Sequence, residues 1–174
     1  TYRARVNARG YEQVDGVHYD EDSKSAPVVN GATIHIVLII MLMSALWIAE
    51  VLDVQGAFLY GEFLEGEVLY MKVPQGFERF YPENCVLLLL KTLYGLKQAA
   101  YACWRRLVQA FRGMGYARNK ADPCLYFKWT IHGLVLWVSW VDDCLVCGTR
   151  KAVEITKTQM KGNFSCDELD ELQE

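Results

Sequence analysis

The sequence has few features of secreted, membrane-spanning or disordered proteins. Only four of its 174 residues are proline and 52% are hydrophobic, a composition too apolar for a disordered chain. The nearly continuous apolar run over residues 34–49 is interrupted by His35 and Ser44 and is shorter than the roughly 20 residues that span a bilayer. No secretory signal pattern is found near the first residue. We therefore expect no membrane partner, with a membrane-associated protein built around residues 34–49 as a minor alternative.

The cysteines show no pattern of a disulfide framework or of a zinc site. Six are present, and the one close pair, Cys144 and Cys147, has neither a second pair nor a nearby histidine to complete four ligands. On a β-strand these two side chains would point to opposite faces of the sheet. We expect reduced, buried thiols, as in intracellular proteins.

Positive charge is scarce overall but concentrated locally. The formal net charge is −3, which argues against a protein that coats nucleic acid through its bulk charge. Residues 91–128 nevertheless carry eight Lys and Arg residues against the single acid Asp122, and residues 1–10 hold three Arg and no acid. This segregation indicates a locally bound polyanion. For any single basic segment, a solvated surface is the alternative.

The apolar pattern predicts a mixture of helices and strands, which places the chain in the α+β class. A strong amphipathic pattern predicts a helix over residues 98–112, and further helices are expected over 33–48, with Thr33 as the N-cap, and over 151–162. Strands are expected over residues 1–9, 49–54, 67–73, 124–129, 134–141 and 144–147.

Three aspartates require an explanation. Asp142 and Asp143 interrupt an otherwise apolar hairpin that offers no Lys or Arg to pair with them, and Asp53 ends an apolar strand. Buried carboxylates are normally paired or bound to a cation, although an exposed hairpin tip would also explain the adjacent pair. Two strands that each bring an Asp to one sheet edge can hold two divalent ions about 3.5–4 Å apart, as in phosphoryl transfer.

These aspartates belong to a set of seven motifs that resembles a known family. The sequence is similar, over nearly its whole length, to the reverse transcriptase domain of copia-type (Pseudoviridae-like) LTR retrotransposon polyproteins. A lone VDD motif would be weak support, but all seven segments occur in the order and spacing of the family. They are residues 2–11 (YRARVNARGY), 26–28 (APV), 52–61 (LDVQGAFLYG), 74–77 (PQGF), 93–99 (LYGLKQA), 120–123 (KADP) and 141–143 (VDD).

The resemblance implies a right-hand polymerase fold made of fingers and palm. Residues 1–48 and 60–100 would form the fingers, and residues 49–59 and 101–174 the palm. The sequence is expected to be truncated before the thumb. The implied activity is RNA-directed DNA polymerisation, in which a primer 3′-hydroxyl attacks the α-phosphate of a dNTP. The alternative is a catalytically inactive, truncated remnant that at most binds nucleic acid.

The resemblance also implies roles for individual residues. Asp53, Asp142 and Asp143 would bind two Mg²⁺, with Mn²⁺ as a substitute, and the carbonyl group of Val54 could join them. Four residues match positions that contact the incoming dNTP: Arg5, Arg9, Phe58 and Gln98. A solvated strand face is the alternative for the two arginines, and core packing is the alternative for Phe58.

Nucleic-acid contacts are expected along the basic segment. The side chains that could follow template or primer phosphates are Lys97, Arg105, Arg106 and Arg112. Trp140 stands where the family usually has Tyr, so it can stack on a primer terminus but offers no hydroxyl group.

The implied partners are an RNA or DNA template with its primer, dNTPs, and the other polyprotein parts (thumb, RNase H, integrase and protease). The implied location is the cytoplasm, within virus-like particles, with a nuclear phase left open. We expect the isolated fragment to be weakly active or inactive.

Overall fold

The computed structural model describes residues 5–169, which form a mixed α and β structure. The chain divides into two compact units. The first contains residues 1–26 and 58–106, and the second contains residues 27–57 and 107–174. The assignment of fingers and palm to parts of the chain stays a prediction.

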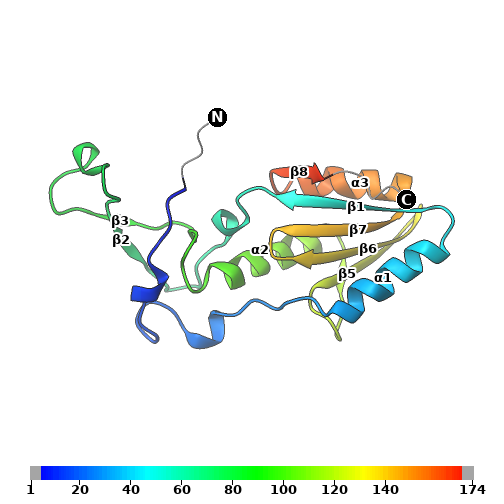
Figure 1. The fold of residues 1–174 in the computed structure, drawn as a ribbon, viewed down its shortest axis with the longest axis horizontal. Coiled ribbons are helices and arrows are strands. Elements are labelled where there is room, and N and C mark those ends of the chain that lie inside the picture. Colours follow the sequence, from blue (N-terminus) through cyan, green and yellow to red (C-terminus); the bar gives the residue numbers. More distant parts are fainter. Residues whose placement is uncertain (1–4, 170–174) are drawn as a thin grey trace. The chain divides into compact units, whose positions relative to one another are not determined.

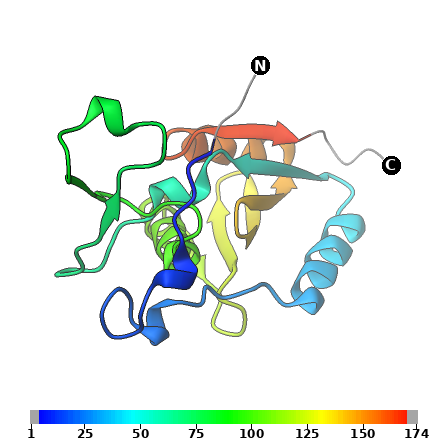
Figure 2. The ribbon, with the colours of Figure 1, turned by 60° about the vertical axis from the view of Figure 1, so that its left-hand side comes forward.

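The second unit is built on an antiparallel sheet with the strand order β4-β5-β6-β7-β1-β8. Figure 1 shows β5, β6, β7 and β1 side by side, and Figure 2 shows β8 next to β1. β1 therefore lies between β7 and β8. The strands are β1 (Trp47–Val54), β4 (Ala117–Arg118), β5 (Leu125–Thr130), β6 (Gly133–Trp140), β7 (Asp143–Thr149) and β8 (Cys166–Leu169).

Both faces of the central strands are buried, which explains the apolar run over residues 134–141. Alternate side chains of a strand point to opposite faces. On one face Leu136 and Val138 pack with Val37 of helix α1 (Gly31–Met43). On the other face Trp137 contacts Phe111 of helix α2 (Ala99–Gly113), with ring centroids 5.5 Å apart, and helix α3 (Arg150–Lys161) contacts β6 and β7.

Helices α2 and α3 confirm the predicted helices to within one residue at each end, whereas for α1 the predicted N-cap is wrong and the predicted end lies five residues too far along the chain. α1 begins at Gly31, because Asn30 is its N-cap and accepts a hydrogen bond from Ala32 N. It ends at Met43, and β1 begins at Trp47. The apolar residues 34–49 thus divide into a helix and a strand, a division that uniform hydrophobicity does not reveal.

Thr33 makes a different contact from the predicted cap. Its hydroxyl group donates to the carboxylate of Asp122, at 2.6 Å, and Asn30 N donates to the same oxygen, at 3.0 Å. Cys124 N donates to the other carboxylate oxygen, at 2.9 Å. Burial works to raise the pKa of Asp122, but these three hydrogen bonds outweigh it and hold that pKa below its ordinary value. Asp122 therefore joins the start of α1 to the start of β5.

We expect Asp122→Asn to lower the free energy of unfolding by about 1.5–3 kcal/mol at pH 7, because three hydrogen bonds to a carboxylate are weakened or lost. A group with a lowered folded-state pKa stabilises the protein above its unfolded-state pKa, near 4, and loses this effect as the pH falls through the folded-state value. The difference between wild type and variant should therefore narrow between pH 5 and pH 2 in urea titrations. A constant difference would contradict the assignment.

The first unit contains short elements. A strand predicted over residues 1–9 is wrong for residues 5–9, which have no ladder partner, and residues 1–4 lie outside the described residues. Ala8 N instead donates to Tyr94 O, at 2.7 Å. Gly95 has φ +87°, and a Cβ there would lie 2.2 Å from the carbonyl oxygen of Ala8, so only glycine fits. The short elements are η1 (Gly10–Glu12), η2 (Glu21–Ser23), η3 (Ala57–Tyr60), η4 (Glu78–Phe80), β2 (Tyr70–Lys72) and β3 (Val86–Leu88).

The six cysteines are free thiols, and the prediction that they are buried is confirmed for Cys103, Cys124, Cys144 and Cys147 but not for the partly exposed Cys85 and Cys166. Burial raises the pKa of Cys124 to about 11 and that of Cys147 to about 12, so both stay protonated near neutral pH. Between residues 5 and 169, no helix is long and apolar enough to cross a membrane.

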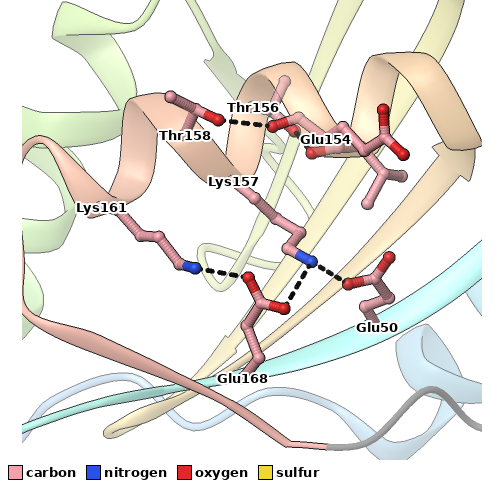
Figure 3. A network of polar contacts seen from close by, with 8 residues as sticks. Glu50, Glu154, Thr156, Lys157, Thr158, Lys161 and Glu168 are labelled. Atoms are coloured by element: carbon pink, nitrogen blue, oxygen red, sulfur yellow. Dashed lines mark hydrogen bonds and ion pairs between the residues drawn. The ribbon is translucent and has the colours of Figure 1, made fainter.

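A partly buried ion network joins α3 to β1 and β8. The Lys157 ammonium group donates to Glu50 of β1 and, at 3.1 Å, to Glu168 of β8, and Lys161 donates to Glu168 as well (Figure 3). Lys157 and Glu50 are buried. This network connects segments that are far apart in the sequence.

Candidate active site

Two of the three predicted catalytic carboxylates are neighbours across the sheet. Asp53, near the end of β1, is the register partner of Asp143, the first residue of β7. Directly opposite residues of antiparallel strands share one face, with Cβ atoms roughly 4.5–5.5 Å apart. The third, Asp142, lies in the adjacent turn, and its carbonyl oxygen accepts a hydrogen bond from Val54 N, at 2.8 Å. The fold thus brings Asp53, Asp142 and Asp143 to one edge of the second unit.

The electrostatics of this edge favour a cation. Asp142 and Asp143 are exposed at the tip of the hairpin, which is the turn position given above as the alternative. Partial desolvation raises the pKa of Asp143, and the negative charges of Asp142 and Asp53 raise it further. Carboxylate oxygens are the ligands that Mg²⁺ and Mn²⁺ prefer, so the donor set fits a divalent ion. Within residues 5–169, however, no three His, Cys, Asp or Glu side chains converge on one point that could hold a metal. The backbone therefore places the carboxylates side by side, while their side chains do not form a closed cage.

The turn that carries Asp142 is strained. Trp140 and Asp143 pair in register, so Val141 and Asp142 form a two-residue hairpin loop. Val141 has φ +57°, a left-handed conformation that is unfavourable for a β-branched residue. The adjacent carboxylates are thus carried on a sharp turn whose first residue is poorly suited to it.

We expect Val141→Gly to raise the free energy of unfolding by about 0.5–1 kcal/mol. Relief of the left-handed strain is worth about 1–2 kcal/mol, and part of it is offset by the larger chain entropy of glycine, about 0.5–1 kcal/mol. Chemical denaturation checks the change. Val86→Gly, at an exposed position in strand β3, is the matched control and should lower stability; a loss of stability in both variants would contradict the strain.

A fourth aspartate, which the sequence did not indicate, lies beside Asp53 on the neighbouring strand. We call the residues that pair in register across β8, β1, β7 and β6 at this end of the sheet a row. Asp167 of β8 is the register partner of Asp53 on its other side. Its carboxylate accepts a hydrogen bond from the side-chain nitrogen Nε2 of Gln55, at 2.5 Å. The side-chain oxygen Oε1 of Gln55 in turn accepts one from Ser165 Oγ, at 2.9 Å. No local sequence pattern predicts the strand over Cys166–Leu169 that carries Asp167.

Trp140 lies in the same row on the opposite side of Asp143, and its side chain is exposed. Arg112, also in the second unit, is exposed near the end of α2. Both are accessible to a ligand, and their contacts with nucleic acid stay predictions.

The residues predicted to contact dNTP lie in the first unit. Arg5 lies over the Tyr94 ring, 5.6 Å from its centroid, and Phe58 meets the same ring edge-on at 5.2 Å. Arg9 forms an exposed ion pair with Glu12, at 3.2 Å. Phe58 is partly buried against a small apolar cluster. These contacts show core packing for Phe58 and leave its role in dNTP selection a prediction.

Gln98 is buried and held by three partners. Its amide nitrogen donates to Glu67 Oε1, at 2.7 Å, and to the carbonyl oxygen of His18, at 3.1 Å. Its carbonyl oxygen accepts from Gln13 Nε2, at 3.0 Å, and Gln13 Oε1 accepts from Lys97 N. Gln98 therefore holds together three segments of the first unit, a role that its motif alone did not reveal.

The other basic residues of the first unit are differently placed. Lys97 lies over the Tyr19 ring, 5.9 Å from the centroid, whereas Arg105 and Arg106 on α2 are half-buried. This unit also contains a cavity of about 650 Å³, within the usual size range of small-molecule sites. The charged and polar side chains in its lining include Arg9, His18, Lys72, Gln75 and Glu78.

The sequence matches known proteins along its whole length. The family model described as reverse transcriptase (RNA-dependent DNA polymerase) matches residues 1–174. The Retrovirus-related Pol polyprotein from transposon TNT 1-94 of Nicotiana tabacum is 36% identical over 165 residues, which is 94% of this chain and 12% of that protein. The polyproteins from transposons RE1 and RE2 of Arabidopsis thaliana are each 33% identical over 172 residues, 98% of this chain. The chain spans 11–12% of the length of these relatives.

Proposed function

The chain belongs to the reverse transcriptase (RNA-dependent DNA polymerase) family, with copia-type retrotransposon polyproteins among its relatives, and we propose that it extends a primer with dNTPs on an RNA or DNA template. The observation that carries the proposal is the cross-strand pair of Asp53 and Asp143 beside Asp142. We assign a catalytic role to this pair because Asp53 lies in the motif at residues 52–61 and Asp143 in the VDD motif at residues 141–143, both of which match the family.

The proposed metal ligands are Asp53, Asp142 and Asp143, together with the carbonyl oxygen of Val54. Bound Mg²⁺ would stabilise charge on the attacking and leaving oxygens of the displacement. The position of a bound ion would be set by the carboxylates, because β1 and β7 hold Asp53 and Asp143 opposite each other. Desolvation and then the negative charges of Asp142 and Asp53 raise the pKa of Asp143, and this mutual repulsion of the carboxylates supports the binding of a cation there.

The dNTP would be bound by the first unit. Arg5 and Arg9 offer planar guanidinium groups suited to a triphosphate, and Arg9 would exchange its exposed contact with Glu12 for phosphate. The buried Gln98 would contact the dNTP only by giving up one of its present partners, so we assign it mainly to holding the surrounding segments in place. Phe58 would limit the space beside the sugar.

Template and primer would contact basic side chains and Trp140. Phosphate contacts are independent of sequence and weaken as salt rises. The residues assigned to these contacts are Lys97, Arg105 and Arg106 in the first unit and, separately, Arg112 and Trp140 in the second unit. In the polyprotein we propose the thumb, RNase H, integrase and protease parts as partners, and virus-like particles in the cytoplasm as the setting.

A second candidate function is an inactive remnant that binds nucleic acid. The observation that favours it is the exposed position of Asp142 and Asp143 at a hairpin tip, where aspartate is also a common turn residue without a catalytic role. The two functions differ in their need for metal, because phosphate contacts by Lys and Arg require none.

The test is primer extension by the 174-residue chain on poly(rA)·oligo(dT), with Mg²⁺, with Mn²⁺ and with metal chelated. Incorporation that requires metal would support the polymerase. Salt-dependent binding of primer–template without incorporation under any condition would reject it in favour of the binding module.

A further inference from the structure

Helix α1 carries two apolar stripes on opposite sides. Ile34, Val37 and Met41 face the core of the second unit, where Val37 is only 1% exposed. The spacing of 3.6 residues per turn places a second set, Ile36, Ile39, Ile40 and Met43, on the opposite side. We call this second set the outer stripe. A surface helix normally presents polar residues there.

The outer stripe is exposed. Ile36 and Ile39 are 57% and 53% exposed, Ile40 is 36% exposed and Met43 is 82% exposed. Leu42 and Leu46 flank it and are 70% and 80% exposed. Together these six residues expose roughly 700 Å², an upper limit on the area that a partner could cover, which compares with the ~800 Å² that each partner buries in a standard protein interface. A patch of this size marks an interaction surface.

The chemistry of the helix selects the partner. No Asp, Glu, Lys or Arg lies between Gly31 and Ala49, so the surface offers nothing to a charged peptide or to anionic lipid headgroups, which basic interfacial helices attract. The same absence removes like-charge repulsion between two copies. The spacing i, i+3, i+4, i+7 of the outer stripe is the spacing with which helices pack against helices.

We propose that α1 is a self-association surface, through which two copies of the chain pack outer stripe against outer stripe about a two-fold axis. In such an interface each residue of one copy contacts its counterparts in the other. Ile39 and Ile40 lie at the centre of the stripe, so each lies near the axis and meets the same region of the partner copy. The proposal concerns the second unit alone and does not depend on polymerase activity.

The experiment measures the mass of the 174-residue chain by sedimentation velocity over a dilution series. Wild type is expected to be a dimer that dissociates on dilution. Ile39→Glu and Ile39→Lys should each weaken association at least 10-fold while leaving the circular dichroism spectrum unchanged. A mixture of the two variants should dimerise again, because opposite charges then meet near the axis.

Ile131→Glu is the matched control, since Ile131 is an equally large aliphatic residue, 96% exposed in the β5–β6 turn. It should leave association unchanged. A wild type that stays monomeric at every concentration overturns the proposal. The proposal is also overturned if Ile39→Glu does not disrupt the oligomers, or if a mixture of the two variants stays monomeric. It is overturned as well if the chain is a monomer that binds uncharged phosphatidylcholine vesicles through α1.

Discussion

Replacing both carboxylates of the hairpin turn, in an Asp142→Asn/Asp143→Asn variant, is expected to reduce metal-dependent nucleotide incorporation at least ~100-fold. Metal ions in such a site contribute several kcal/mol of charge stabilisation to the transition state, and each 1.4 kcal/mol is a tenfold change in rate. Asn keeps the shape of Asp but carries no charge, so the loss reflects electrostatics and not packing. Primer extension by wild type and variant measures it.

The same variant separates chemistry from folding. Mn²⁺ binding, followed by electron paramagnetic resonance, should weaken at least 10-fold. Thermal unfolding should stay close to wild type or improve, because the variant loses both the desolvated charge of Asp143 and its repulsion by Asp142 and Asp53. Glu83→Gln removes one charge from an exposed position in the first unit and is the control. Wild-type levels of incorporation and Mn²⁺ binding in the double variant would refute the assigned role of these carboxylates.

Lys157→Ala is expected to lower the free energy of unfolding by about 3–5 kcal/mol, because it leaves Glu50 buried without its cation. Lys157 lies between Glu50 and Glu168 (Figure 3). Burial works to lower its pKa, but the hydrogen bonds to Glu50 and Glu168 outweigh it and raise that pKa above the ordinary value. Urea denaturation at pH 7 measures the loss.

Two further variants test whether the uncompensated charge of Glu50 causes the loss of stability in Lys157→Ala. Lys151→Ala, on the exposed side of the same helix, should change stability by less than about 0.5 kcal/mol. Glu50→Leu/Lys157→Met replaces the pair by apolar groups and should recover most of the loss, because a buried ion pair contributes little beyond a well-packed apolar pair. If the double variant is as unstable as Lys157→Ala, lost packing explains the effect better than the uncompensated charge.

The raised pKa of Lys157 determines how the stabilisation by this network depends on pH. A lysine whose folded-state pKa is raised contributes its full stabilisation below the unfolded-state pKa, near 10.5, and loses it as the pH rises through the folded-state value. The stability difference between wild type and Lys157→Ala should therefore be constant from pH 7 to pH 9 and shrink above pH 10.5.

The sequence by itself determined the family and the identity of the candidate catalytic carboxylates. The LYGLKQA and VDD segments and the other motifs are local strings, so their order is readable without coordinates, and the match over residues 1–174 confirms the resemblance. Helices α2 and α3 were also predictable, because the apolar residues on the buried face of an amphipathic helix recur with a period of 3.6 residues. The mixed α and β class followed from the same patterns.

Tertiary structure alone decided what depends on contacts between distant segments. The start of α1 follows from Asn30 and Asp122, because a helix that is apolar on every side has no periodicity to mark where it begins. The position of Asp167 beside Asp53 follows from the pairing of β8 with β1. The pairing of Lys157 with Glu50 requires α3 to pack on the sheet. Strand register and buried charge pairs are set by the free energy of the whole core, to which each local segment contributes only a part.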